Sequence, residues 1–536
     1  MSYDELFQEY TKLKNENENL KLQVNNFKRI IYGVKREHTP KKEQLEISTQ
    51  CSLFDIEENI DKELQQQVLD NVEEITVYKK KKNKTKKAGI KKSFLKDIEI
   101  EVKEYKINKD EACPECGSEL KEIAKEVVRQ EVTYIPAKLV LTNYVQYTYR
   151  CTECGGKNSD NASITFVKTK LPNPLLTHSF ISPSLATEVI YQKYYLGVPL
   201  YRQEKMWDDR GLVLPRNMMA NWNIKLAEYY LTPLCDAMFK KLKQENKLAH
   251  TDETTIQCNK EEGRNASSKS YMWVYSSGEL ENIRGTVFHY SPSRSEKTAK
   301  EFLTGYKGIL VTDGYASYNN IEEVLHAECW AHARRYFYES VPLNDSKKMD
   351  TTAPGYKGVE YCDELFKIER EIAQLSVEEK LKKRQEKSKP VLEAFFEWVK
   401  TMNEKIILNK KLKESITYAI NQEKELSQFL NDGQIPLTNS LAERAIRPFA
   451  VHRKNWLFAD SVPGANANAT MYTIIESAKL NNLNIEKYIK YLLDNLPQLE
   501  SIYDEKCLEK YFPWSKELPA DILSFQGTYE DMKMFE

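Results

Sequence analysis

Residues 248–258 of the chain read LAHTDETTIQC, and residues 306–318 read YKGILVTDGYASY. The first segment opens a series of three segments rich in β-branched and aromatic residues, which continues with SYMWVYSS at 270–277 and TVFHYSP at 286–292. The second quoted segment is an apolar run that ends in Asp and Gly, as expected where a buried strand brings a side chain to the edge of a sheet. The sequence therefore predicts four strands of one sheet.

Two acids in these segments indicate a metal-dependent site. Three strands followed by a fourth that ends in an acid suggest a ribonuclease-H-like α/β arrangement, in which adjacent strands bring Asp252 and Asp313, each at or near a strand end, side by side. Two adjacent carboxylates repel one another, whereas a pair of Mg²⁺ (or Mn²⁺) ions bridged by them would neutralise the charge and stabilise attacking and leaving oxygens. The chemistry implied is phosphoryl transfer.

A third acid, Glu443, lies in the segment PLTNSLAERAIRPFAVHRKNWLF. We expect a helix over Leu437–Arg447 that stops near Pro448, with Glu443 paired to Arg447 one turn later. A surface Glu/Arg pair is commonplace, and so is an Asp before Gly in a turn, so no acid of this set is persuasive alone. The neighbouring basic group favours phosphate contact more than a random basic face would: Arg444, Arg447, His452, Arg453 and Lys454.

Four of the ten cysteines form two close pairs, each followed by glycine. Tight turns at these glycines would let the four thiolates converge on one tetrahedral Zn²⁺, and scattered cysteines in an intracellular protein favour metal over disulfides. The sequence predicts a zinc ribbon, whose role could be purely structural, with these ligands: Cys113, Cys116, Cys151 and Cys154.

A further group, His326, Cys329 and His332, has spacings that could suit a metal. At a predicted strand-to-helix junction, such residues more often pack the core or orient a substrate, so we leave them out of the ligands.

Residues 183–240 are expected to be helical, with a helix-turn-helix pattern inside them. RQEKMWDDRGLVLPRNMMANWNIKL reads as a helix, a turn at Gly211 and a second helix opened by Pro215. An ordinary helical hairpin gives the same pattern. If the unit binds DNA, the second helix would lie in a groove and reach bases or phosphates through Arg216, Asn217, Asn221 and Asn223.

Residues 3–31 carry a heptad pattern with Leu6, Leu13, Leu20 and Phe27 at one core position. This predicts a coiled coil that joins protomers, the alternative being one amphipathic helix docked on its own chain. The polar stretch that follows is predicted to be a linker. Its lysine block is either a solvated tract or an arm that contacts phosphates, and includes Lys79, Lys80, Lys81, Lys82, Lys84, Lys86 and Lys87.

The chain of 536 residues is too long for one hydrophobic core, so several domains are expected. The net charge of −1 hides a segregated distribution of basic residues. No apolar run approaches the length of a membrane span, and the N-terminus has no secretory pattern. We expect a cytoplasmic protein without a membrane partner.

The motifs CPECG, YRCTEC, PLYRQE, HTDET, TDGYASY, CWAHARRYF, LAERAIRPFAVHRKNWLF and IIESAKLNN together resemble the large transposase of the insertion-sequence-66 family, in the family's order and over nearly the whole chain. The resemblance implies a bacterial, nucleoid-associated enzyme and maps Asp252, Asp313 and Glu443 onto a catalytic Asp-Asp-Glu triad. It also implies two small companion proteins encoded by the same element. Family members usually carry an acid and two asparagines before the last helix, where this chain has Thr438, Asn439 and Ser440.

The prediction is a multidomain α+β protein. Its parts are expected to be a coiled coil at 1–40, a basic flexible linker at 41–110, a zinc-binding segment at 111–170, a helix-turn-helix region at 171–243, a ribonuclease-H-like catalytic domain at 244–485 with a helical insertion at about 340–430, and a C-terminal tail at 486–536.

The functional hypothesis is a DNA transposase that cuts transposon ends and joins them to target DNA with two divalent metals per active site. One alternative is a non-catalytic DNA-binding regulator on an inactive transposase fold. Another is a nuclease of the same fold that acts on RNA or hybrids.

Overall fold

The computed structural model describes residues 138–150, 166–168, 171–342 and 349–523. Backbone contacts divide the chain into Met1–Glu104 and Tyr105–Glu536, and every described residue belongs to the second unit. The predicted coiled coil, the lysine block and the four predicted zinc cysteines lie outside the described residues. No helix of the described part is both long enough and apolar enough to cross a membrane.

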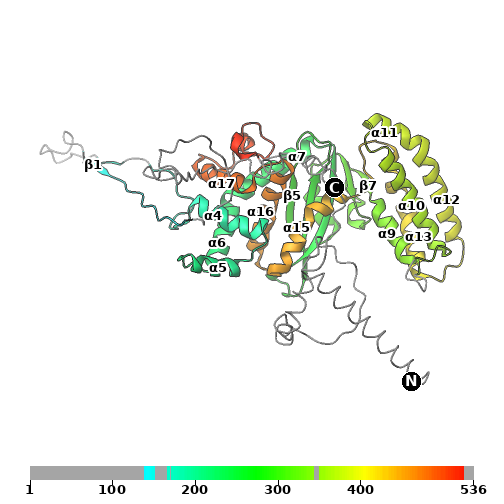
Figure 1. Cartoon of the computed structure of the whole chain (residues 1–536), viewed down its shortest axis with the longest axis horizontal. Coiled ribbons are helices and arrows are strands. Elements are labelled where there is room, and N and C mark those ends of the chain that lie inside the picture. Colours follow the sequence, from blue (N-terminus) through cyan, green and yellow to red (C-terminus); the bar gives the residue numbers. More distant parts are fainter. Residues whose placement is uncertain (1–137, 151–165, 169–170, 343–348, 524–536) are drawn as a thin grey trace, which may run out of the picture. The chain divides into compact units, whose positions relative to one another are not determined.

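A mixed sheet lies at the centre of the described unit (Figure 1). Its strand order is β5-β4-β3-β6-β7, with β3, β4 and β5 antiparallel and with β6 and β7 parallel to β3. All four strands predicted from the sequence are present, and of the predicted multidomain α+β fold the mixture of helices and strands is confirmed. The strands are β3 (Leu248–Lys260), β4 (Lys269–Ser277), β5 (Thr286–Ser291), β6 (Ile309–Thr312) and β7 (Leu325–Glu328).

Strand β3 has two different neighbours along one edge. Its first residues pair with β6, and this ladder ends at His250 opposite Val311. Its last residues pair with β8 (Ala459–Ser461), beginning at Cys258 opposite Ala459. Between these two ladders the sheet opens as a fork, because β6 is only four residues long whereas β3 has thirteen.

Helices cover the sheet and share one hydrophobic core with it. Side chains from the helices before β3, from the sheet and from the helices after β8 belong to the same buried cluster, for example Leu226, Met272 and Tyr472. The region predicted as a separate helix-turn-helix domain therefore has no core of its own. These helices are α4 (Pro183–Ile190), α5 (Leu200–Asp209), α6 (Arg216–Leu226), α7 (Thr232–Glu245), α15 (Ser440–Trp456), α16 (Val462–Leu480) and α17 (Ile485–Asn495).

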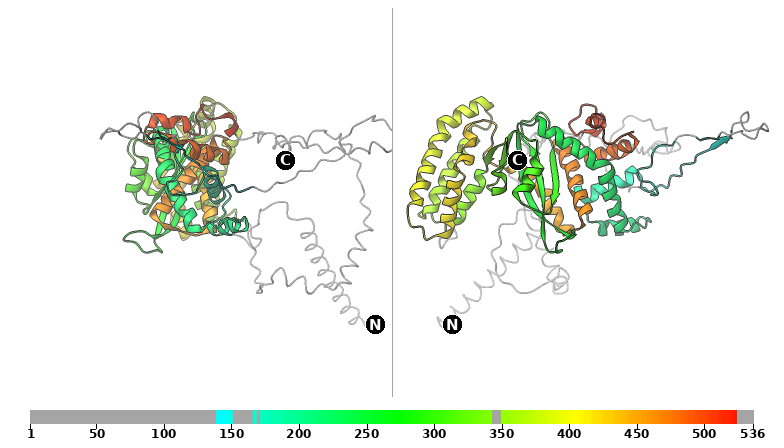
Figure 2. Two further views of the ribbon diagram at one scale, coloured as in Figure 1. Left: turned by 90° about the vertical axis from the view of Figure 1, so that its left-hand side faces the viewer. Right: turned by 180° about the vertical axis from the view of Figure 1, so that it is seen from behind.

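A second core holds together the helices between β7 and α15, which form a bundle in Figure 2. Trp330 packs edge-on against Phe395, and the buried Arg384 pairs with Glu369 while it donates to the carbonyl of Phe429. The predicted insertion is thus helical in the structure. Its helices are α9 (Trp330–Ser340), α10 (Pro354–Glu371), α11 (Val377–Lys383), α12 (Lys389–Asn403), α13 (Lys410–Asn421) and α14 (Glu423–Leu426).

The predicted limits of the helix that carries Glu443 are wrong. Helix α15 begins at Ser440 and runs through Pro448 to Trp456. A proline inside a helix removes a hydrogen bond. Burial of Ala442, Ala445 and Phe449 in the core shared with β3 and β4 offsets that loss and keeps the helix continuous.

The remaining elements are short or lie at the edges of the unit. The residues predicted as a C-terminal tail contribute Leu492 and Tyr511 to the main core. These elements are β1 (Thr148–Arg150), β2 (Phe166–Lys168), α8 (Glu296–Leu303), α18 (Glu505–Leu508), the π-helical turns Tyr191–Tyr195, Ala227–Leu231 and Arg384–Ser388, and the 3₁₀ turns Ala316–Tyr318, Gln428–Leu430, Leu496–Gln498, Glu509–Tyr511 and Ala520–Ile522.

Candidate active site

The fork between β3 and β6 brings two of the predicted acids together. Asp313 follows the last residue of β6 directly, and Asp252 lies two residues beyond the last β3–β6 pair. The sequence predicts that Asp252 lies at or near a strand end. In the structure it lies in the interior of β3. It nevertheless lies at the edge of the paired region, because β6 stops there.

Electrostatics show that the third acid also lies close by. Burial raises the pKa of Asp252 from 3.8 to about 8, and the negative charges of Glu253, Asp313 and Glu443 act in the same direction. Carboxylates crowded in this way repel one another unless a cation is shared between them. The oxygen donors and the excess of negative charge fit Mg²⁺ or Mn²⁺.

The raised pKa of Asp252 predicts a pH-dependent cost to stability. In buffer without added divalent metal, the folded state binds the carboxyl proton more tightly than the unfolded chain, so the parent protein loses stability as the pH rises from about 4 to about 8. We expect Asp252→Asn to raise the free energy of unfolding by on the order of 4 kcal/mol at neutral pH and by almost nothing near pH 4.

Urea unfolding of the parent and of Asp252→Asn across this pH range measures the effect. Added Mg²⁺ should stabilise the parent more than the variant, because the ion binds the native carboxylate. An equal stability difference at every pH would contradict the prediction.

A second acid of β3, Glu253, faces the opposite side of the sheet and is held in place. Its side chain is 1% exposed, and its carboxylate accepts hydrogen bonds from Arg294 and Tyr318. Arg294 also lies 3.9 Å from the Asp313 carboxylate and 3.6 Å from the centre of the Tyr315 ring. Arg294 thus links β3 to the loop after β6 and partly neutralises Asp313. The sequence interpretation did not identify this group.

Asn439 fixes the start of the helix that carries Glu443. Its buried side chain donates to the carbonyl of Thr251 at 2.8 Å, and its Oδ1 lies 3.0 Å from Nδ1 of His250. Its backbone N–H donates to Sγ of Cys329 at 3.2 Å. Through its side chain and its backbone, Asn439 therefore joins β3, the start of α9 and the first turn of α15.

Cys329 and His332, which were left out of the predicted ligands, lie beside Glu443. One ligand atom from each of these three residues lies within 4.8 Å of the other two. The buried Nδ1 of His332 has no hydrogen-bond partner among the described residues, and burial lowers the pKa of this imidazole. His326 is not part of the group, since its Nε2 pairs with Thr312 Oγ1 at 2.7 Å. A neutral imidazole next to Glu443 adds a nitrogen donor to the site.

The helical insertion touches the loop that carries Asp313. A Cβ added to Gly314 would lie 2.3 Å from Cε2 of Tyr418 on α13, so only glycine fits there. The Tyr418 hydroxyl donates to the buried carboxylate of Glu328 at 3.1 Å. Burial raises the pKa of Glu328 to about 8. The insertion therefore packs directly against the candidate site.

The residues predicted to contact DNA differ in their solvent exposure. Arg216, Asn217, Asn221, Arg444, Arg447 and Lys454 are exposed, whereas Arg453 is partly buried and donates to Thr255. The prediction for Asn223 is wrong, because this side chain is buried on the face of α6 that includes Met219 and Trp222. Glu443 makes no ion pair with Arg447 within the described ranges, so that predicted pair is also absent.

A turn joins α5 and α6 as the sequence suggested, with Gly211 at φ +80°. Pro215 lies at the position just before the first turn of α6. This geometry is shared by helical hairpins and DNA-binding units, so groove binding by α6 stays a prediction.

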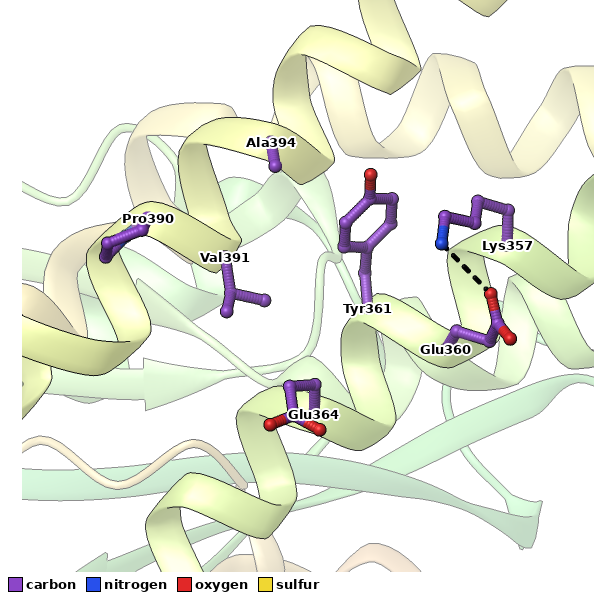
Figure 3. A pocket seen from close by; sticks show the side chains of 7 residues that line it. All are labelled: Lys357, Glu360, Tyr361, Glu364, Pro390, Val391 and Ala394. Atoms are coloured by element: carbon purple, nitrogen blue, oxygen red, sulfur yellow. Dashed lines mark hydrogen bonds and ion pairs between the residues drawn. The ribbon is translucent and has the colours of Figure 1, made fainter.

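The insertion also has an open hollow of about 430 Å³ between α10 and α12 (Figure 3). Lys357 and Glu360 form an ion pair at its rim, 3.1 Å apart. None of the residues that line this hollow belongs to the carboxylate group. It is not part of the candidate active site.

Comparison with known proteins points to one family. Residues 178–467 match the family model described as "Transposase IS66 family", and residues 110–155 match "zinc-finger binding domain of transposase IS66". The second match spans all four predicted zinc cysteines.

Relatives of this chain come from Sinorhizobium fredii. "Uncharacterized protein y4hP" is 29% identical over 428 residues, which cover 76% of this chain and 74% of the relative. "Uncharacterized protein y4jD" is 26% identical over 419 residues, with 75% and 78% covered. Among solved structures, the "Drosophila P element transposase strand transfer complex" matches at 11% identity and a TM-score of 0.22, over 62% of this chain and 86% of that one. That likeness is too weak to carry an argument.

Proposed function

This chain belongs to the IS66 transposase family, and on that premise we propose that it catalyses metal-dependent strand cleavage at transposon ends and strand transfer into target DNA. The observation that carries the proposal is that Asp252 and Asp313 flank the fork between β3 and β6, with Glu443 near enough for its charge to act on the pKa of Asp252. The strand order, with three antiparallel strands followed by two parallel ones, supports a ribonuclease-H-like catalytic domain.

The carboxylates of Asp252, Asp313 and Glu443 would hold two divalent ions, Mg²⁺ or Mn²⁺, through oxygen atoms. Bound there, the ions would supply charge stabilisation for the attacking and leaving oxygens of phosphoryl transfer. The raised pKa of Asp252 supports this assignment, because burial is its main cause and the nearby charges of Glu253, Asp313 and Glu443 add to it, so a bound cation would favour the ionised carboxylate.

The other side chains of the site would position these acids. Arg294 holds Glu253 and reduces the repulsion between Glu253 and Asp313. Asn439 fixes the first turn of α15, and with it the place of Glu443. His332 would place an imidazole nitrogen beside Glu443 and Cys329, and its own Nδ1 is buried without a partner among the described residues.

Modules outside the described residues complete the proposal. The zinc-finger match supports a structural Zn²⁺, for which we propose Cys113, Cys116, Cys151 and Cys154 as ligands. The coiled coil would join protomers, and the lysine block with the exposed residues of α6 would bind DNA. The proposed partners are the companion proteins of the same element and DNA. The proposed location is the nucleoid in the bacterial cytoplasm.

The test is an assay of strand cleavage and joining on end-labelled DNA from the chain's own element. The protein is supplied with the companion proteins and with Mg²⁺, Mn²⁺ or no added metal. We expect new 3′ ends and joined products only with metal. If the protein binds ends but never cuts in any metal, the catalytic proposal fails and a DNA-binding regulator becomes the better account.

A further inference from the structure

Helix α15 ends in an unusual turn at Leu457. This residue has φ +64° and ψ −49°, and the N–H of Phe458 donates to the carbonyl of Trp456 at 2.8 Å. These values describe a γ-turn with positive φ, a rare and strained conformation for a residue with a side chain. Four non-glycine residues of the described chain have positive φ, and Leu457 is the one with an aliphatic side chain.

The turn is held on both sides. The N–H of Leu457 donates to the carbonyl of Arg453 at 2.7 Å, and Trp456 packs against Phe449 in the core. On the other side, Ala459 is buried and pairs with β3. The surrounding structure therefore fixes the strained backbone, and such residues cluster at functional sites.

The two apolar side chains at this turn point to solvent. Leu457 is 66% exposed and Phe458 is 43% exposed. Burial inside the protein would favour both by the hydrophobic effect, yet the fixed backbone keeps them outside. Because the backbone is already ordered, binding a partner with these side chains would cost little further conformational entropy.

A basic face of α15 leads from Glu443 to this turn. At 100° per residue, an arc of about 100° contains Glu443, Arg447, Val451, Lys454 and Arg444. The three cations are exposed and have no ion-pair partner within the described ranges. A polyanion is the partner that this charge fits.

The length of α15 sets the distance between Glu443 and the turn at Leu457. From Glu443 to Leu457 the helix advances about 20 Å at 1.5 Å per residue, which corresponds to about six base steps of duplex DNA at 3.4 Å each. A duplex that follows the basic face would therefore meet the turn about six base pairs from the phosphate at the carboxylates.

We propose that Leu457 and Phe458 form an apolar wedge that enters the base stack of transposon-end DNA about six base pairs from the cleaved phosphate, while Arg444, Arg447 and Lys454 hold the backbone beside it. The proposal rests on the proposed function. Apolar wedges of this kind unstack a base step and bend the duplex. The bend would let the strand approach the recessed acids at the fork.

Base unstacking can be measured without cleavage. End DNA carries 2-aminopurine at successive positions, and fluorescence is recorded with Ca²⁺ as a non-reactive ion. We expect an increase of several-fold at one position about six base pairs from the cleavage site. Leu457→Ala/Phe458→Ala should abolish the increase and weaken end binding by about tenfold, with the salt dependence of binding unchanged.

Two matched variants separate the wedge from other effects. Leu408→Ala removes a 94%-exposed leucine of the insertion and should leave the fluorescence increase intact. Arg447→Ala/Lys454→Ala should instead reduce the salt dependence of binding. Circular dichroism and thermal unfolding check that each variant is folded. If the double alanine variant does not fold, Leu457→Gly/Phe458→Ala, in which glycine suits the γ-turn, removes the same two side chains.

The outcomes distinguish the two proposals. Binding and cleavage by the parent without a fluorescence increase at any position overturn the wedge and leave the catalytic function in place. A fluorescence increase without cleavage in either Mg²⁺ or Mn²⁺, with the companion proteins present, supports the wedge and contradicts the catalytic function. If the double variant changes the oligomeric state in sedimentation but not the fluorescence, these side chains bind a second copy of the chain and the wedge is wrong.

Discussion

Asp313→Ala should lower strand cleavage at transposon ends by at least about 10³-fold while end-binding affinity stays within about twofold of the parent. Asp313 lies at the end of β6 beside Asp252, where its carboxylate would hold the ions that stabilise the reacting oxygens. Removing it takes away a ligand but no core contact, since the side chain is 24% exposed. Single-turnover cleavage and an equilibrium binding assay measure the two quantities.

Asp252→Ala and Glu443→Ala should show the same loss, because acids that share ions act as a unit and their effects do not add. Glu322→Ala is the matched control, since this exposed acid follows Asp313 in the same segment without belonging to the fork. Cleavage by Asp313→Ala at the parent's rate would remove the triad from the mechanism. Equal loss of binding and cleavage would show a folding defect instead.

Gly314→Ala should lower cleavage by about 10²-fold, because it displaces the loop that carries Asp313. The added Cβ would lie 2.3 Å from the ring of Tyr418, and that ring is held by its hydrogen bond to Glu328 and by packing on Tyr336. A shift of about 1 Å at a reacting group is enough for a loss of this size.

A second substitution tests the physical cause. In the double variant Gly314→Ala/Tyr418→Ala the clash is gone, so cleavage should recover relative to Gly314→Ala alone. Tyr418→Phe keeps the ring and removes only the hydrogen bond to Glu328, and it serves as the control that should not rescue Gly314→Ala. If the double variant stays as inactive as the single one, the loop is not controlled by α13.

Local sequence patterns predicted the strands and the acid at the end of β6 well. An apolar run that stops at Asp and Gly marks a strand end directly, as at Asp313. The place of Asp252 could not be read in this way, because it depends on where a different strand, β6, stops pairing with β3. Likewise, Pro448 predicts a helix end by its own chemistry, whereas the continuity of α15 depends on packing against the sheet.

Contacts between distant segments were beyond the sequence. Cys329 and His332 meet Glu443 only because the insertion closes back on the sheet. Asn223 has a polar side chain that suits DNA, yet Met219, Trp222 and Leu226 mark its side of α6 as the buried face. That periodicity was a usable signal. No sequence signal indicated the hydrogen bond from Arg294 to Glu253, since the two residues lie on separate elements 41 residues apart in the chain.

The sheet and the helices before it share one core, and this limits how the protein can recognise transposon-end DNA. Helix α6 and the strand that carries Asp252 contribute to one buried cluster, so neither can swivel without exposing apolar surface of the other. If α6 binds a specific sequence in the transposon end, the protein fixes the number of base pairs between that sequence and the cleaved phosphate. A single base pair added to that interval would rotate the cleavage site about the duplex axis, away from the carboxylates.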